Sequence, residues 1–249
     1  QGVQTVEKLL THLFKLNSYN LFSTKEYMSR VRGGSNSTEI RVSSKKVRSY
    51  VDRIDILFPL NRDALHHVRK RINPDTIIIG DKQKLNGNPN EKYEIVDVPF
   101  STLAQEIGGE IFTNIISVGL IAAFFSIEPE FLRKFIRIQF SRKGEEIEQK
   151  NVHAAMVGYE HGARLVSSGR ININIRKDPT VQDEIIVSGG EAVGLGALAG
   201  GCNFLSSYPM TPSTDVLTFL ARHAKMFHVV VEQAEDEIAS IGIVVGAGW

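Results

Sequence analysis

Two short stretches near the C-terminal end carry side chains that could do chemistry. The first is Tyr-Pro-Met-Thr-Pro-Ser at residues 208–213. Its two prolines fix their own φ angles and keep the residues before them out of the helical region. Thr211 is therefore predicted to lie on a stiff turn, with Ser213 or Thr214 as the N-cap of the next helix. A hydroxyl near free N–H groups at a helix N-terminus suits a carboxylate or phosphate, although a plain strand–turn–helix corner has the same local chemistry.

The second stretch is Gln-Ala-Glu-Asp-Glu-Ile-Ala at residues 233–239. It predicts a helix over residues 232–248 that opens with carboxylates, which the helix dipole favours there. Small and apolar residues lie three and four positions from Glu237, so its carboxylate is predicted to point inward, where it needs a partner. Glu235 and Asp236 project at other angles and are predicted to be solvated.

Glycines in the C-terminal part raise the question of a nucleotide site. A strand is predicted at residues 185–187 and a small-residue helix at residues 189–201. Gly194, Gly196 and Ala199 satisfy a loose dinucleotide fingerprint. That motif needs its first glycine in the strand-to-helix turn and an acid near the end of the next strand. Gly194 falls inside the helix and the next strand ends on serines, so these glycines are predicted to allow close helix packing.

The N-terminal two thirds of the chain alternate strand-like and helix-like patterns. This alternation predicts a layered α/β domain. Helices are predicted at residues 3–16, 61–71, 111–125, 129–141 and 145–166, and strands at residues 20–27, 37–44, 54–60, 75–80 and 93–98. The stretch that follows is polar, shows no apolar period and is interpreted as an interdomain linker. The predicted domains are therefore 1–168 and 185–249, joined by 169–184.

Composition excludes several classes of protein. Hydrophobic residues make up 42% of the chain and charged residues 23%, as in ordinary globular proteins. A net charge of +1 gives no case for nucleic-acid binding, and no apolar run reaches membrane-spanning length. Cys202 is the single cysteine, so the chain alone can hold no iron–sulfur cluster, and a reducing, cytoplasmic location is predicted. His66 and His67 are adjacent, do not share a helix face and therefore predict no metal site.

Three motifs together resemble the α subunit of the 2-oxoacid:acceptor (ferredoxin) oxidoreductases. They are the turn at 208–213, where the family usually has Tyr-Pro-Ile-Thr-Pro-Ser, the run at 233–239, and the glycine-rich run at 190–202. The N-terminal part is similar to the family's γ subunit, mainly through Ser-Arg-Val-Arg-Gly-Gly-Ser at 29–35. Many members fuse γ ahead of α.

The resemblance implies an α/β fold throughout. A layered α/β γ-type domain that lacks its N-terminal strand would be followed by the start of a thiamine-diphosphate pyrimidine-binding-type α/β domain, truncated at its C-terminus. The chain is thus expected to be an internal fragment of a longer polypeptide. Arg30 and Arg32 are expected to belong to a hairpin connection, and the resemblance raises the alternative of an anion or subunit contact.

The resemblance also implies a reaction. Family members oxidatively decarboxylate a 2-oxo acid with thiamine diphosphate and coenzyme A, and pass the electrons through iron–sulfur clusters to ferredoxin. In thiamine enzymes a glutamate hydrogen-bonds nitrogen N1′ of the aminopyrimidine and favours its imino tautomer; Glu237 aligns with that catalytic, cofactor-binding residue. Thr211 aligns with the threonine that binds the substrate carboxylate, and Tyr208 and Pro209 would shape the pocket wall.

A partner subunit is expected to complete the site. In the family, the β subunit holds the cofactor's diphosphate, its Mg²⁺ and at least one 4Fe–4S cluster, so the chain would be active only with β. The favoured substrate is 2-oxoglutarate, because γ–α fusion is common among such enzymes; pyruvate and branched-chain 2-oxo acids stay open. The alternatives are a non-catalytic scaffold or assembly subunit and, less in keeping with the glycine positions, a nucleotide-binding oxidoreductase.

Overall fold

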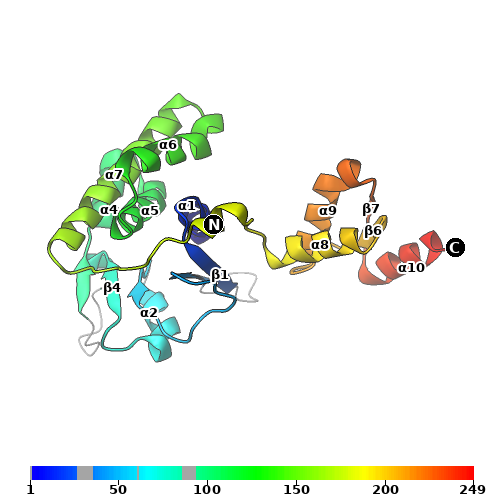
Figure 1. Ribbon diagram of the computed structural model, residues 1–249, viewed down its shortest axis with the longest axis horizontal. Coiled ribbons are helices and arrows are strands. Elements are labelled where there is room, and N and C mark those ends of the chain that lie inside the picture. The colour runs from blue at the N-terminus through cyan, green and yellow to red at the C-terminus, as the bar shows by residue number, and fades with distance from the viewer. Residues whose placement is uncertain (1, 27–35, 61, 86–93) are drawn as a thin grey trace. The chain divides into compact units, whose positions relative to one another are not determined.

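The computed structural model describes residues 2–26, 36–60, 62–85 and 94–249 (Figure 1). The chain divides by its internal contacts into two units, Gln1–Glu184 and Ile185–Trp249. Arg30 and Arg32, the predicted hairpin connection or contact, lie outside the described residues.

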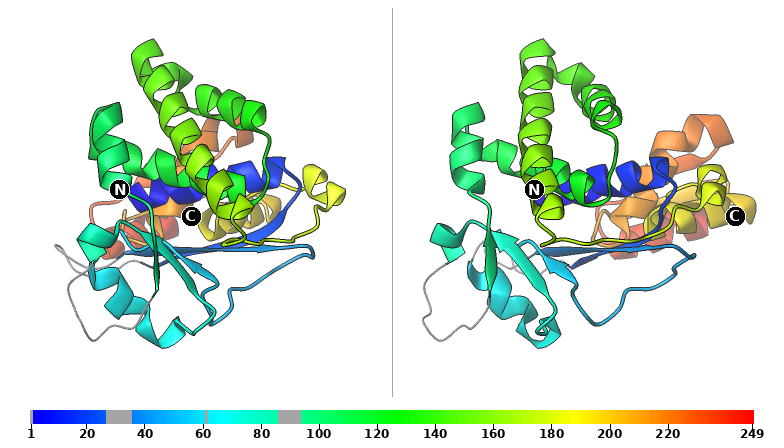
Figure 2. Two further views of the ribbon diagram at one scale, coloured as in Figure 1. Left: turned by 90° about the vertical axis from the view of Figure 1, so that its left-hand side faces the viewer. Right: turned by 60° about the vertical axis from the view of Figure 1, so that its left-hand side comes forward.

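The first unit is a layered α/β domain, as its alternating pattern predicts. Its strands form an antiparallel pair, β1 with β2, and a parallel sheet in the order β3-β4-β5. Figure 2 shows α1 and the helices from α5 to α7 gathered on one side of these strands. The elements are α1 (Gly2–Leu16), β1 (Asn20–Glu26), β2 (Ser37–Ser43), β3 (Ile56–Leu57), α2 (Arg62–Val68), β4 (Ile77–Gly80), α3 (Lys82–Leu85), β5 (Ile95–Asp97), α4 (Phe100–Ile107), α5 (Thr113–Phe124), α6 (Pro129–Phe140) and α7 (Glu145–Ser167).

The core of this unit lies between α1, α5 and α7. The apolar period of α1 buries Leu9, Leu10, Leu13 and Phe14, and the mainly apolar α5 is buried on most sides, as the sequence predicts. The strand predicted over residues 54–60 is shorter than expected and contains only β3. Its ladder to β4 pairs two residues on each strand.

Glycines bring α5 and α7 into backbone contact. A Cβ placed on Gly119 would lie 1.8 Å from the carbonyl oxygen of Ala155, and one on Gly158 would lie 1.9 Å from that of Ile116. Gly162 lies one turn further along α7, and a Cβ placed on it would lie 2.4 Å from the carbonyl oxygen of Leu120. No other residue type fits these three positions, so the two helices form a rigid pair.

The stretch predicted as a linker, 169–184, lies on the first unit. Ile171 is buried, and Ile173 and Ile175 pack against the same core. The Asp178 N–H donates to the carbonyl oxygen of Ser18 at 2.7 Å, which fixes the end of the segment. Isoleucine at every second residue is an apolar period of two, and the interpretation of a polar stretch without a period overlooked it.

The second unit contains two parallel strands and three helices. They are α8 (Gly189–Ala199), β6 (Phe204–Ser207), α9 (Thr214–Phe227), β7 (Val230–Gln233) and α10 (Glu237–Ala247), with β6 paired to β7. The strand predicted at residues 185–187 is wrong: these residues form no ladder with any described residue, and Ile185 is 76% exposed. A β-branched run becomes a strand only where a neighbour accepts its backbone hydrogen bonds.

Stability of the first unit is expected to fall in acid because of Glu26. Its carboxylate lies 3.0 Å from Nε2 of His67 and accepts from Ser37. Hydrogen bonding to His67, opposed in part by burial, holds the pKa of Glu26 below its usual 4.5. A folded-state pKa below the unfolded one stabilises the protein above the unfolded pKa, and this contribution is lost as pH falls through the folded pKa. Thermal unfolding followed from about pH 6 to pH 3 should show a shallower acid loss in Glu26→Gln than in the wild type; parallel curves would rule out this contribution.

Candidate functional site

The turn at 208–213 and the segment that leads to Glu237 both begin at the carboxyl end of the sheet in the second unit. Strands β6 and β7 run parallel, Ser207 is paired with Gln233, and the N–H of Ala234 donates to the carbonyl oxygen of Ser207 at 3.0 Å. The segments that follow the two strands therefore start next to each other, at the carboxyl end of the sheet. Open α/β sheets bind ligands at this end. The turn with Thr211 and the start of the helix with Glu237 both belong to it.

The turn at 208–213 is held by its own hydrogen bonds. The N–H of Met210 donates to the carbonyl oxygen of Tyr208 at 2.9 Å, and the Thr211–Pro212 peptide is cis. The carbonyl oxygen of Met210 accepts from Oγ of Ser213 at 2.6 Å and from the N–H of Thr214 at 3.1 Å. Tyr208 is half-buried, whereas Thr211 is exposed. Thr211 thus lies exposed on a turn that is held by hydrogen bonds, and the turn itself is as the sequence predicts.

Ser213 is the N-cap residue of α9, as predicted, but its side chain makes no hydrogen bond to the helix. Ser213 occupies the N-cap position of α9, and Thr214 is the first helical residue. The Ser213 hydroxyl donates to Met210 and makes no side-chain cap hydrogen bond to the helix. Backbone carbonyls accept from the first N–H groups of α9 instead: Thr214 donates to Met210, and Val216 and Leu217 donate to Ser213. No side chain caps this helix.

The structure corrects the predicted surroundings of Glu237. Strand β7 runs to Gln233, and α10 begins only at Glu237, five residues after the predicted start. Asp236 is the N-cap, and its carboxylate accepts from the N–H of Ala239 at 2.7 Å. Residues 233 and 234 are therefore not on the same helix as Glu237, and the side chain of Glu237 is exposed. The prediction that it points inward is wrong within this chain.

The apolar face predicted for this helix is present but uncovered. No residue of α10 is buried, Ile238 is 83% exposed and Ile241 is 67% exposed. Glu235 and Asp236 are exposed, as expected. In the described part of the chain, Glu237 thus lies on an open surface and not in an enclosed cavity.

Two helices besides α10 begin at the same edge. A Cβ on Gly190 would lie 2.5 Å from Cβ of Asp215, so the first turns of α8 and α9 are in contact. Ser188 and Glu191 close a capping box at the start of α8. Helix N-termini favour negative charge, and three of them meet the carboxyl end of this sheet.

The glycine positions confirm the packing prediction. Gly194 lies inside α8, and a Cβ there would lie 2.4 Å from Cδ1 of Phe219 on α9. The close approach of α8 to α9 accounts for this glycine, and the strand-to-helix turn that a dinucleotide fingerprint needs is not where Gly194 lies.

Sequence reasoning missed two residues at this edge. Asp236 is exposed, as predicted, but its role as the N-cap of α10 was not foreseen; an Asp three residues before a helical N–H is the signal that could have placed the helix start. Ser206 is buried on β6, and its hydroxyl has no hydrogen-bond partner among the residues placed by the structure. A serine in a β-rich run gives no such signal.

No group of three or more His, Cys, Asp or Glu side chains among the described residues could hold a metal ion. No single described helix is long and apolar enough to cross a membrane; one pair, Phe100–Ile107 with Glu110–Phe124, reaches that length and composition only with a bend of 118° between its parts.

Two family descriptions match the sequence. Residues 1–161 match the pyruvate ferredoxin/flavodoxin oxidoreductase family. Residues 195–249, which contain the turn at 208–213 and Glu237, match the thiamine diphosphate-binding domain of pyruvate flavodoxin/ferredoxin oxidoreductases.

Individual relatives and a solved structure agree with this match. The 2-oxoglutarate oxidoreductase subunit KorA of Mycobacterium tuberculosis is 27% identical over 100% of this chain and 43% of that protein. The 2-oxoglutarate synthase subunit KorC of Archaeoglobus fulgidus is 29% identical over 66% of this chain and 84% of its own length. The 2-oxoglutarate:ferredoxin oxidoreductase from Magnetococcus marinus, solved with 2-oxoglutarate, coenzyme A and succinyl-CoA bound, superposes with a TM-score of 0.84 at 28% identity, over 99% of this chain and 43% of that one.

The chain thus spans a little under half the length of the α-type relatives that it matches. The α/β fold expected from the sequence is confirmed by the superposition. Since the first family match covers well over half of its residues, the chain belongs to the pyruvate ferredoxin/flavodoxin oxidoreductase family, the 2-oxoacid:ferredoxin oxidoreductases.

Proposed function

We propose that the chain is part of a fused γ–α subunit of a thiamine-diphosphate-dependent 2-oxoacid:ferredoxin oxidoreductase. It would convert a 2-oxo acid and coenzyme A to acyl-CoA and carbon dioxide, with ferredoxin as the electron acceptor. The observation that carries this proposal is the placement of Thr211 and Glu237 at one edge of a parallel sheet, within a thiamine diphosphate-binding family match.

The domain assignment follows the same matches. We assign residues 1–168 to the γ-type domain and residues 185–249 to the pyrimidine-binding domain. The γ assignment is supported by the family match over 1–161, and the pyrimidine-binding assignment by the match over 195–249. The change of structural unit at Ile185 agrees with this boundary.

Glu237 is the residue that we propose to hold the cofactor. Its carboxylate is available to a cofactor, because it is exposed and makes no hydrogen bond or ion pair with any residue that the structure describes. An ionised carboxylate can only accept hydrogen bonds, so it can accept one from a protonated nitrogen of an aminopyrimidine ring. When bound, thiamine diphosphate supplies the carbon nucleophile that attacks the 2-oxo group. Glu237 would orient the pyrimidine and hold the proton at N1′.

The exposure of Glu237 supports a shared site. A carboxylate that directs a proton acts more strongly in a dry environment, and the chain by itself leaves this one in water. The uncovered apolar face of α10 begins at the neighbouring Ile238. We therefore propose that a β subunit closes the site, and that it also holds the diphosphate, Mg²⁺ and a 4Fe–4S cluster. This chain has a single thiol, Cys202, whereas a 4Fe–4S cluster is held by four cysteines.

Thr211 is the residue that we propose to bind the substrate carboxylate. Its hydroxyl stands on a turn that is fixed by hydrogen bonds and lies beside the start of α9. A hydroxyl donor beside the positive end of a helix dipole suits a carboxylate, and a rigid mount reduces the entropy lost on binding. Tyr208 and Pro209 would form the adjoining wall.

Replacing Thr211 with alanine is expected to weaken 2-oxo acid binding. Loss of one hydrogen bond to a charged group should raise KM about tenfold or more and leave kcat close to that of the wild type. Steady-state kinetics on the full-length protein with its partner would show this split. The control is Thr218→Ala, which removes an exposed hydroxyl from α9 away from the turn. An unchanged KM in Thr211→Ala would refute the assignment.

For the substrate, we favour 2-oxoglutarate. The relatives named above from Mycobacterium and Archaeoglobus are both described as 2-oxoglutarate enzymes, and the Magnetococcus enzyme was solved with 2-oxoglutarate and coenzyme A bound. Activity measured with 2-oxoglutarate, pyruvate and 2-oxoisovalerate separates the candidates.

A further inference from the structure

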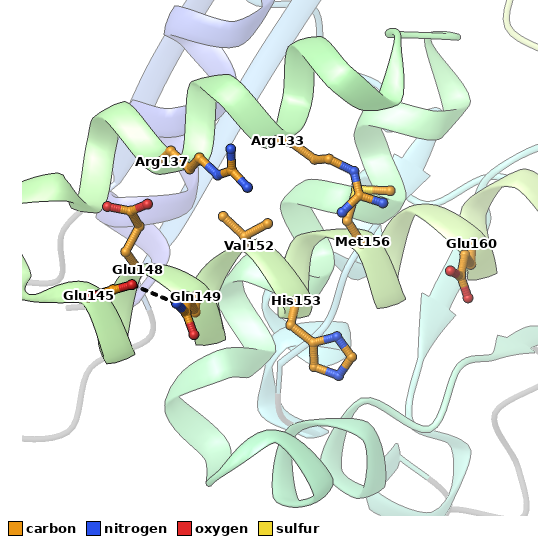
Figure 3. Close-up of a pocket in the computed structure, with 9 residues that line it drawn as sticks. All are labelled: Arg133, Arg137, Glu145, Glu148, Gln149, Val152, His153, Met156 and Glu160. Carbon is orange, nitrogen blue, oxygen red and sulfur yellow. Dashed lines mark hydrogen bonds between the residues drawn. The ribbon is translucent and has the colours of Figure 1, made fainter.

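A groove between α6 and α7 of the first unit lies outside the proposed chemistry. It has a volume of about 490 Å³, within the range of small-molecule sites. Figure 3 shows the guanidinium groups of Arg137 and Arg133 reaching from α6 over Val152 and Met156 of α7. Glu148 stands at the Arg137 end of the same groove (Figure 3).

The two arginines have donors to spare. They are four residues apart on α6, so they share one helix face. Arg137 forms no ion pair or hydrogen bond with a residue in the described ranges. Nε of Arg133 forms an ion pair with Oε1 of Glu130 at 3.2 Å, and its terminal nitrogens have no partner among the described residues. A guanidinium group with free terminal nitrogens matches the planar geometry of a carboxylate.

The opposite wall carries negative charge. Glu145, Glu148 and Glu160 of α7 line the groove, and Glu145 accepts from Gln149 at 3.1 Å. Glu148 is without a partner among the residues that the structure places. A simple anion in the groove would be repelled by these carboxylates, and a simple cation by the arginines. A ligand that bears both charges satisfies both walls.

The floor is apolar and rigid. Val152 and Met156 are buried at 8% exposure each. Helix α7 is fixed on α5 by the contacts of Gly158 and Gly162, so the groove does not need to be ordered when a ligand binds. An apolar side chain of a ligand would lie over Val152 and Met156.

We propose that the groove between α6 and α7 binds a small zwitterion, an α-amino acid with an apolar side chain. Arg137 and Arg133 take its carboxylate, Glu148 takes its ammonium group, and Val152 and Met156 contact its side chain. The site is separate from the edge that carries Thr211 and Glu237 in sequence and in structural unit. The inference therefore does not depend on the proposed reaction.

The test is a titration of the full-length protein, in complex with its partner subunit, with L-leucine, L-valine and L-methionine. Calorimetry and ligand-detected NMR report binding without any assay of activity. We expect a Kd of about 1 mM or lower for at least one of them. For leucine, two analogues separate the walls: 4-methylpentanoate lacks the ammonium group and 3-methylbutylamine lacks the carboxylate. Each should bind about tenfold more weakly or worse, because each leaves one charged wall unpaired.

Variants locate the site. Arg137→Gln and Glu148→Gln should each weaken amino-acid binding about tenfold or more, and neither substitution breaks a hydrogen bond or ion pair between described residues. Lys134→Gln is the control, since Lys134 is exposed on α6 and does not line the groove. No saturable binding of any of the three amino acids would overturn the proposal. Binding of 4-methylpentanoate as tight as that of leucine, with no effect of Glu148→Gln, would also overturn it, because it would show an anion site only.

Discussion

Glu237→Gln is expected to leave the fold intact and to reduce turnover by about 100- to 10,000-fold. The amide keeps the size of the side chain and loses the charge that favours a proton at the pyrimidine nitrogen. The fold should not respond, because Asp236 and not Glu237 caps α10, and the Glu237 side chain is exposed. Turnover by the full-length protein with its partner, compared with thermal unfolding of the same preparation, measures both effects.

The matched control is Glu235→Gln. Glu235 is exposed, lies two residues before Glu237 and is outside α10, so it tests the loss of a negative charge near the site. It should turn over like the wild type. Wild-type turnover in Glu237→Gln itself would remove this residue from the mechanism and with it the main support for the proposed chemistry.

Gly158→Ala is expected to destabilise the first unit strongly. The new Cβ would lie 1.9 Å from the carbonyl oxygen of Ile116, a backbone atom that cannot rotate away. Helices α5 and α7 would have to separate along the centre of the core. Overpacking of a core costs about 3 kcal/mol or more where backbone must move, and for a protein of this size that lowers Tm by about 10 °C. Gly119→Ala should behave alike, since its Cβ would meet Ala155.

Gly196→Ala provides the control for helix propensity. Gly196 lies inside α8, and a Cβ there meets nothing within 4 Å. The same substitution should therefore be neutral or stabilise by about 0.5–1 kcal/mol, because alanine favours the helix. Circular dichroism melting of the three variants distinguishes the cases. A Gly158→Ala protein as stable as Gly196→Ala would show that α5 and α7 are not in contact as described.

The helices of the first unit could be predicted because each carries one unambiguous period. Leu9, Leu13 and their neighbours fix the buried face of α1, and Pro129 marks the first turn of α6. Close packing at Gly194 could also be predicted from its position inside a helix. These are local properties of the sequence.

Other features depend on neighbours that a local pattern does not show. Residues 185–187 are β-branched but have no ladder partner, and 169–184 packs on the core through isoleucines two residues apart. The predicted inward orientation of Glu237 rests on a helix that begins five residues too early. Strand pairing carries β7 through Gln233, and the Asp236 cap then sets the start of α10. The identity of Thr211 and Glu237 as candidates came from the family motifs, and their common sheet edge came from the structure.

The measurement that tests the central claim most directly is viologen dye reduction by the full-length protein with its β partner. Thiamine diphosphate, Mg²⁺ and coenzyme A would be present, and 2-oxoglutarate, pyruvate and 2-oxoisovalerate would be compared. We predict reduction that requires coenzyme A and is fastest with 2-oxoglutarate. No reduction with any of the three, in a complex shown to contain cofactor and clusters, would contradict the proposed function and favour a non-catalytic scaffold subunit.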